Sequence, residues 1–150
     1  MLPDVLLRDV EPAHSDLLIL RRGGMWDSGG GAPFATTARV FLQAAVPVAA
    51  ICGATAGLAR AGLLDQRAHT SSAPEYLAAT GYAGGDHYRD ERAVVDDKVI
   101  TAGPRSPVQF ARATLAHLRL APDTTLDAYE RLFHDGDRTA YPVLMRAQHN

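Results

Sequence analysis

The sequence predicts a single α/β domain over residues 1–150, built around a mostly parallel sheet. Short apolar runs of strand length alternate with longer segments that have the apolar spacing of helices. The two clearest runs are almost free of polar residues, which is typical of strands that are buried on both faces of a sheet. A chain of 150 residues is also long enough to bury a substantial core.

The first part of the chain contains two expected strands, each followed by a turn and a helix. Residues 16–20, DLLIL, form the first strand, which ends at the arginines and glycines of residues 21–24. A glycine-rich loop at residues 27–31 then leads to Pro33, a residue that suits the first turn of a helix. The second strand is expected at residues 46–51, VPVAAI.

The middle of the chain continues the alternation. Residues 55–61 are alanine-rich and predict a helix, with Gly62 as its C-terminal cap. A third short strand is expected at residues 67–70 and a short helix at residues 74–79. Residues 94–101 predict two short strands around an Asp-Asp-Lys turn.

The last part of the chain is expected to be helical. Ser106 is the predicted N-cap of a helix that runs to about Leu118. A final amphipathic helix starts at Asp123 or Thr124. Connections between parallel strands are expected to be right-handed crossovers, and such sheets carry their sites beyond the carboxyl ends of the strands.

Composition and charge exclude several classes of partner. The formal net charge of −2 gives no basic footprint for nucleic acid or for an anionic membrane surface. No apolar run approaches the roughly 20 residues of a membrane span, and the N-terminus lacks the pattern of a signal peptide. One cysteine excludes an internal disulfide, so a cytoplasmic location is expected. No cofactor or metal is expected, because the acidic residues between Asp86 and Asp97 match no ligand spacing.

That one cysteine, Cys52, follows the second strand and precedes an alanine-rich helix. A nucleophile at a strand-to-helix turn is exposed at the top of the sheet, and the helix N-terminus lowers a thiol pKa from about 8.5 to about 3.5–7.5. Gly53 and Ala54 are small, as a sharp turn requires, although Ala50 stands where the elbow motif has its first glycine. The alternative is an inert thiol that fills the core.

Gly23 and Gly24 follow the first strand and are expected at the same sheet edge as Cys52. Their backbone N–H groups, together with that of Gly53, are candidates for an oxyanion hole. A plain turn explains the two adjacent glycines equally well.

Three segments carry a family resemblance: DLLILRRGGMW, VPVAAICGATAGLARAGLLDQRAHTSS and VVDDKVITAGPRSPVQFARATLAHL. In order and spacing they are similar to the ThiJ/PfpI family of the class I glutamine amidotransferase-like superfamily, which includes the Parkinsonism-associated deglycase. The resemblance extends from about Val5 to Leu118. It implies a flavodoxin-like three-layer sandwich, Cys52 at the nucleophile elbow, and an oxyanion hole at Gly23, Gly24 and Gly53.

The chain departs from the family pattern in three ways. Many relatives have histidine directly after the cysteine, where this chain has Gly53, so His69 becomes the best candidate base and His87 a lesser one. Arg22 replaces a proline that is usual in the family, and the adjacent arginines Arg21 and Arg22 either lower the thiol pKa, bind an anionic substrate, or are solvated loop charges. The family's N-terminal strand-helix-strand unit, which carries a glutamate that hydrogen-bonds the cysteine, has no counterpart here, so an N-terminally truncated version of the fold is expected.

An exposed sheet edge follows from that departure, and a homodimer formed through this edge is expected. A truncated gene product of marginal stability is the alternative. The functional hypothesis is a cysteine-dependent hydrolase or a glyoxalase or deglycase-type enzyme, with a small carbonyl or amide substrate. The competing hypothesis is a non-catalytic redox or stress-response protein, or an inactive relative, in which Cys52 is an oxidation-sensitive thiol.

Overall fold

A computed structural model describes residues 3–147 of the chain. Its sheet has four strands: β1 (Leu18–Leu20), β2 (Val48–Ile51), β3 (Ala93–Asp96) and β4 (Val99–Ala102). The α-helices are α1 (Ala32–Gln43), α2 (Ala54–Arg60), α3 (Pro74–Ala78), α4 (Pro107–His117), α5 (Asp123–Phe133) and α6 (Tyr141–Ala147). Short 3-10 helices are η1 (Leu7–Asp9), η2 (Pro12–His14), η3 (Gly24–Trp26), η4 (Gly85–His87) and η5 (Arg138–Ala140).

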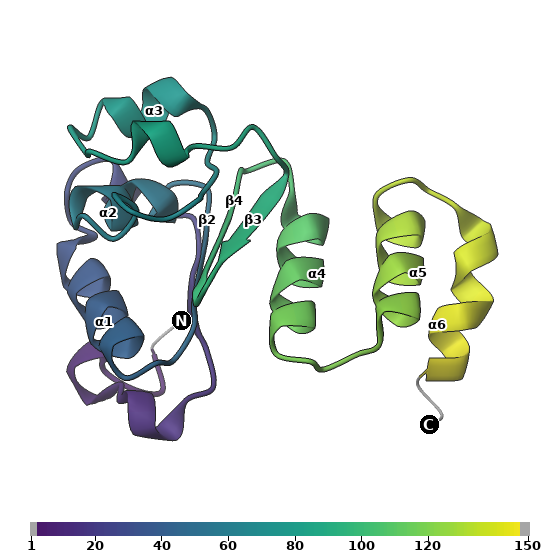
Figure 1. Ribbon diagram of the computed structural model, residues 1–150. Coiled ribbons are helices and arrows are strands. Elements are labelled where there is room, and N and C mark those ends of the chain that lie inside the picture. Colours follow the sequence, from purple (N-terminus) through teal and green to yellow (C-terminus); the bar gives the residue numbers. More distant parts are fainter. Residues whose placement is uncertain (1–2, 148–150) are drawn as a thin grey trace.

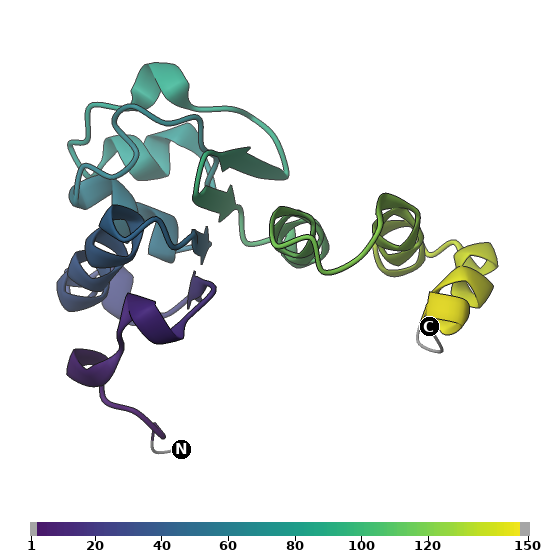
Figure 2. The same cartoon turned by 60° about the horizontal axis from the view of Figure 1, so that its bottom comes forward.

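The sheet is mixed and mostly parallel, as the sequence predicts. Its strand order is β1-β2-β4-β3, in which β1, β2 and β4 are parallel and β3 runs antiparallel to β4. Helices α1 and α2 lie on one side of the sheet and α4 lies on the other, so the body has three layers (Figures 1 and 2). This is a flavodoxin-like α/β arrangement, and it brings the carboxyl ends of β1 and β2 to the same edge.

Helices α5 and α6 extend away from the sheet beyond α4 (Figure 2). Charged and polar side chains join α4 to α5: Gln109 donates a hydrogen bond of 2.9 Å to Glu130, and Arg112 pairs with Asp127 and Glu130. No helix of residues 3–147 has the length and apolar character to cross a membrane.

Strand β1 forms one edge of the sheet, as expected, and its Ile19 side chain is 55% exposed. Pairing of this edge with a second copy stays a prediction.

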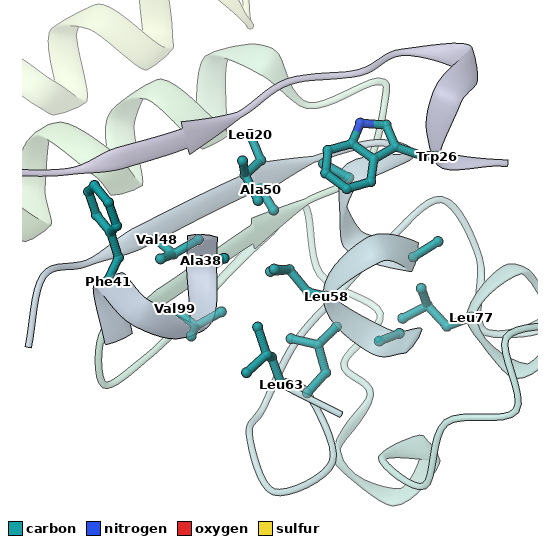
Figure 3. Close-up of a cluster of buried hydrophobic side chains, with 14 residues drawn as sticks. Leu20, Trp26, Ala38, Phe41, Val48, Ala50, Leu58, Leu63, Leu77 and Val99 are labelled. Atoms are coloured by element: carbon teal, nitrogen blue, oxygen red, sulfur yellow. The ribbon is translucent and has the colours of Figure 1, made fainter. Parts of the chain in front are cut away.

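The core lies between β1, β2 and the helices α1 and α2 (Figure 3). Phe41 of α1, Val48 of β2 and Leu58 of α2 are fully buried there. Alanines on α1, α2 and β2 allow these elements to approach closely. Full burial of side chains such as Phe41 and Leu58 contributes about 1.5–3 kcal/mol each to stability.

Trp26 closes this core beyond the end of β1 (Figure 3). Its indole is 3% exposed and donates a hydrogen bond of 2.9 Å to the Arg21 carbonyl. A Cβ placed at Gly31 or at Gly57 would overlap the ring, so both positions require glycine for space rather than for a special backbone conformation. The glycines thus form the two walls of the indole site.

The prediction of a strand at residues 67–70 is wrong. This segment forms one isolated bridge, between His69 and Tyr88, and no strand. Side chains take the hydrogen bonds that a strand ladder would use. The Ala68 N–H donates to the Asp96 carboxylate at 2.6 Å, and the Thr70 N–H donates to the Thr101 hydroxyl at 2.9 Å. Helix α6 also lies beyond the last helix that the sequence predicts.

We expect Gly57→Ala to destabilise the protein by about 1–3 kcal/mol, because the new methyl group overlaps the Trp26 ring. Helix propensity alone favours alanine by about 1 kcal/mol, so the packing overlap reverses the sign of the expected change in stability. Urea unfolding measures the change. Gly85→Ala is the matched control, since nothing lies within 4 Å of the added atom. A Gly57→Ala variant as stable as the wild type would contradict the packing argument.

Candidate active site

Cys52 occupies a sharp turn between β2 and α2. Its φ is +60°, in the left-handed region that residues other than glycine rarely adopt. The Cys52 N–H donates a hydrogen bond of 3.0 Å to the Ala102 carbonyl at the end of β4, and helix α2 begins at Ala54. A strained residue in a strand-to-helix turn is the geometry of a nucleophile elbow, and the thiol is partly exposed at the carboxyl edge of the sheet.

Two buried hydroxyl groups hold the elbow in place. Thr55 donates to the Cys52 carbonyl from its N–H at 3.1 Å and from its hydroxyl at 2.6 Å. The hydroxyl groups of Thr55 and Ser71 lie 2.7 Å apart and form a further hydrogen bond. The turn therefore rests on the segment that follows His69 as well as on α2.

The turn after β1 and the turn after β2 meet at Trp26. A Cβ at Gly23 would lie 3.9 Å from the indole Cδ1, and a Cβ at Gly53 would lie 3.4 Å from the same atom. The backbone N–H groups of Gly23, Gly24 and Gly53 donate no hydrogen bond to any residue of the described chain, 3–147. They are thus free to receive an oxyanion, although that role stays a prediction.

Tyr76 and Asp27 form a polar pair beside the elbow. The Tyr76 hydroxyl donates a hydrogen bond of 2.7 Å to Asp27, and it would lie 3.5 Å from a Cβ at Gly53. Burial, together with the Asp27 carboxylate, raises the pKa of Tyr76 to about 12, and the nearby Cys52 contributes in the same direction. The tyrosine therefore keeps its proton at neutral pH, and it donates that proton to Asp27.

His69 is fully buried, and both of its ring nitrogens have partners. Nδ1 lies 2.7 Å from the Arg67 carbonyl, which only accepts, so we assign the proton to Nδ1. Nε2 then accepts from the Tyr82 hydroxyl at 3.0 Å. Burial lowers the pKa of His69, and the nearby His87 and Arg89 add to this effect. Its role as a base stays a prediction, and Nε2 would have to leave Tyr82 to perform it.

The structure thus places Gly23 and Gly53, the residue after Cys52, beside one indole, whereas His69 has a separate set of partners. Sequence reasoning missed the Thr55–Ser71 and Tyr76–Asp27 pairs. The members of these pairs are 16 and 49 residues apart, so no local spacing indicated them.

The fold and the site define a three-layer α/β protein with a strained cysteine at the carboxyl edge of its sheet. The chain belongs to the DJ-1/PfpI family, whose family model matches residues 1–117.

The chain is similar to several members of this family. It is 35% identical over 131 residues to the uncharacterized protease YoaZ of Bacillus subtilis, a match that covers 85% of this chain and 62% of YoaZ. It superposes on the ThiJ/PfpI family protein of Bacillus anthracis with a TM-score of 0.81 at 32% identity, covering 87% of this chain and 62% of the other. The oxidized DJ-1 of Toxoplasma gondii gives a TM-score of 0.58 at 26% identity, covering 77% and 62%.

We expect Thr55→Val to destabilise the protein by about 1–3 kcal/mol, because the Ser71 hydroxyl and the Cys52 carbonyl both lose a buried partner. Thr55→Ser keeps the hydroxyl and serves as the control. Urea unfolding of the three proteins measures the difference. Equal stability of the valine and serine variants would show that the hydroxyl does not hold the turn.

We expect His69 to make stability depend on pH in the weakly acidic range. Its folded pKa lies below 6.5, so the unfolded chain binds a proton there at a pH where the folded protein does not. This contribution to stability is complete above pH 6.5 and is lost as pH falls below it, with a slope of at most about 1.4 kcal/mol per pH unit. Urea unfolding from about pH 8 to about pH 5 measures the slope, with His69→Gln as the reference. Identical slopes in the two proteins would contradict the assignment.

Proposed function

We propose that the protein is a cysteine-dependent enzyme that acts on a reactive carbonyl or amide through Cys52. The observation that carries this proposal is the φ of +60° at Cys52, in a turn supported by Thr55 and Ser71. Three other non-glycine residues also have a positive φ: Ala45, Asp97 and Arg119. The conformation therefore supports a catalytic role at Cys52 because there it holds a thiol in a strand-to-helix turn at the carboxyl edge of the sheet. Membership of the DJ-1/PfpI family supports the same class.

The chemistry starts with loss of the thiol proton to a base. The Cys52 sulfur then forms a bond to the carbonyl carbon, and the electron pair of the C=O bond moves to oxygen. The free N–H groups of Gly53 and Gly24 are candidate donors to that oxyanion. With an amide, the nitrogen leaves with a proton and a thioester remains, which water hydrolyses. With an aldehyde, the adduct is a hemithioacetal.

YoaZ is described as an uncharacterized protease, which supports hydrolysis of an amide. This chain spans 62% of the length of YoaZ.

A second candidate function is oxidation sensing by Cys52. The thiol is partly exposed, and the Toxoplasma gondii relative is described as oxidized. A partly exposed thiol is accessible to peroxide, and its sulfenic acid is reversible by other thiols. Mass spectrometry of peroxide-treated protein tests this function, and a Cys52 thiol that stays unmodified removes it.

We expect the protein to consume methylglyoxal, a small reactive aldehyde, and Cys52→Ser to reduce this rate to that of buffer alone. The serine hydroxyl is a far weaker nucleophile than a thiolate at neutral pH. Loss of the aldehyde, measured with a carbonyl reagent, gives the rate, and circular dichroism confirms that the variant is folded. Equal rates in the two proteins would rule out a nucleophilic role for Cys52.

A further inference from the structure

Tyr76 brings a hydroxyl group to the elbow from a helix that is anchored in the core. The side chain of Leu77, on the same helix α3, is fully buried, and the Tyr76 ring packs against the core cluster that contains it. The Tyr76 oxygen lies 3.5 Å from the position of a Cβ at Gly53, the residue after Cys52. Packing of α3 therefore sets the position of this oxygen beside the elbow.

Asp27 fixes the direction of the Tyr76 proton. The hydroxyl donates to the Asp27 carboxylate at 2.7 Å, and Asp27 directly follows the buried Trp26. A tyrosine hydroxyl has one proton, and an ionised carboxylate only accepts hydrogen bonds. The Tyr76 proton is therefore committed to Asp27, and the oxygen is left to act as an acceptor.

The acceptor side of the Tyr76 hydroxyl is unused and lies close to the thiol. No donor among residues 3–147 forms a hydrogen bond to the Tyr76 oxygen. Besides burial and Asp27, the negative charge of the Cys52 thiolate contributes to the raised pKa of Tyr76, and Arg60 opposes it. The effect of a charge on a pKa falls with distance, so the thiol and the hydroxyl belong to one site.

The free N–H of Gly53 and the free acceptor of Tyr76 are close enough for one small group to reach both. Two covalent bonds of about 1.5 Å each separate the Cβ position from the Gly53 nitrogen, so this nitrogen lies within about 6.5 Å of the Tyr76 oxygen. Two hydrogen bonds of about 2.9 Å each, together with the width of an amide group, span that distance. A donor at Gly53 and an acceptor at Tyr76 match the oxygen and the N–H of one amide.

Esters and tertiary amides lack the donor that this arrangement requires. Their carbonyl oxygen still reaches the Gly53 N–H, but an alkyl group then displaces water from the Tyr76 oxygen without replacing its hydrogen bond. A polar atom that loses water without gaining a partner costs free energy. The two kinds of substrate therefore differ by one net hydrogen bond.

We propose that Tyr76 is a specificity-determining residue for the Cys52 reaction, and that it selects primary and secondary amides over tertiary amides and esters. The inference rests on the proposed function of Cys52. The substrate oxygen accepts from the Gly53 N–H, the substrate N–H donates to the Tyr76 oxygen, and the carbonyl carbon between them is attacked by the sulfur. Asp27 is a positioning residue, because it takes the proton that would otherwise let the Tyr76 hydroxyl donate.

Alkylation of Cys52 by 2-chloroacetamide and by 2-chloro-N,N-dimethylacetamide tests the selectivity without requiring turnover. The reagents share their carbonyl and their leaving group, and only the first has N–H donors. In each reaction the thiolate sulfur bonds to the CH₂ carbon, and chloride leaves with the electron pair of the C–Cl bond. Cys52 is the one cysteine of the sequence, so loss of free thiol reports this site alone. We expect the ratio of the chloroacetamide rate to the dimethyl rate to be about fivefold higher in the folded protein than in urea.

Tyr76→Phe should return this ratio to the value in urea, because phenylalanine keeps the ring and has no acceptor. Tyr141→Phe is the matched control, since Tyr141 is an exposed tyrosine on α6. A structural effect on the reactivity of the thiol changes both rates together and leaves their ratio unchanged. A Tyr76→Phe protein that keeps the raised ratio would overturn the proposal, because crowding by the two methyl groups would then explain the selectivity.

Asp27→Ala tests the direction of the Tyr76 proton. The freed hydroxyl can donate to the carbonyl oxygen of either reagent, so we expect the dimethyl rate to rise and the ratio to fall by about twofold or more. A ratio equal to that of the wild type would show that Asp27 does not restrict Tyr76 to the acceptor role, and the proposal would fail.

The same reagents separate failure of this inference from failure of the proposed function. Native protein that reacts with both reagents at the ratio found in urea rejects the selectivity and leaves Cys52 as a nucleophile. Native protein that reacts with neither reagent, although the protein in urea does, rejects both the selectivity and the proposed function.

Discussion

The insertion of Trp26 between Gly31 and Gly57 is the contact on which the arrangement of the site depends. Its indole fills the space between the loop after β1, the start of α1 and the body of α2. The ring N–H is tied to the Arg21 carbonyl, and the Trp26 carbonyl accepts from Arg60 at 2.5 Å. A residue held from both of its ends in this way fixes two turns that no strand pairing connects. The sheet alone aligns the ends of β1 and β2, but Trp26 sets how closely the loops beyond them approach.

The elbow at Cys52 depends on the opposite kind of interaction. There the backbone is strained, at a cost on the order of 1–3 kcal/mol, and polar contacts from three directions hold it: Ala102 of β4, Thr55 of α2, and Ser71 behind Thr55. Each contact comes from a different part of the chain, so the conformation of the turn depends on tertiary packing and not on its local sequence alone. The apolar cluster that contains Trp26 and the Thr55–Ser71 hydroxyl pair thus hold Cys52 in a backbone conformation that cysteine does not favour on its own.

Sequence reasoning located the parts of the fold that local patterns determine. Continuous apolar runs predicted β1 and β2, and the Asp-Asp-Lys turn predicted the β3–β4 hairpin. Parallel topology placed Gly23 and Cys52 at one edge. It failed where distant side chains decide the outcome. The segment at residues 67–70 has strand character, but Asp96 and Thr101 take its hydrogen bonds. The partners of His69 include Tyr82, whose position depends on the loop after α3 and not on any spacing in the sequence.

The glycine at position 57 has a consequence for how this protein can change over time. Glycine weakens α2 by about 1 kcal/mol relative to alanine, so the helix is less stable than its alanine-rich sequence allows. Glycine is required at position 57, despite this loss of helix stability, only while the Trp26 ring occupies the space beside it. Positions 26, 31 and 57 are therefore coupled: a smaller side chain at 26 leaves a void that larger residues at 31 and 57 can fill, and each change alone lowers stability. Among homologues, these three positions should vary together.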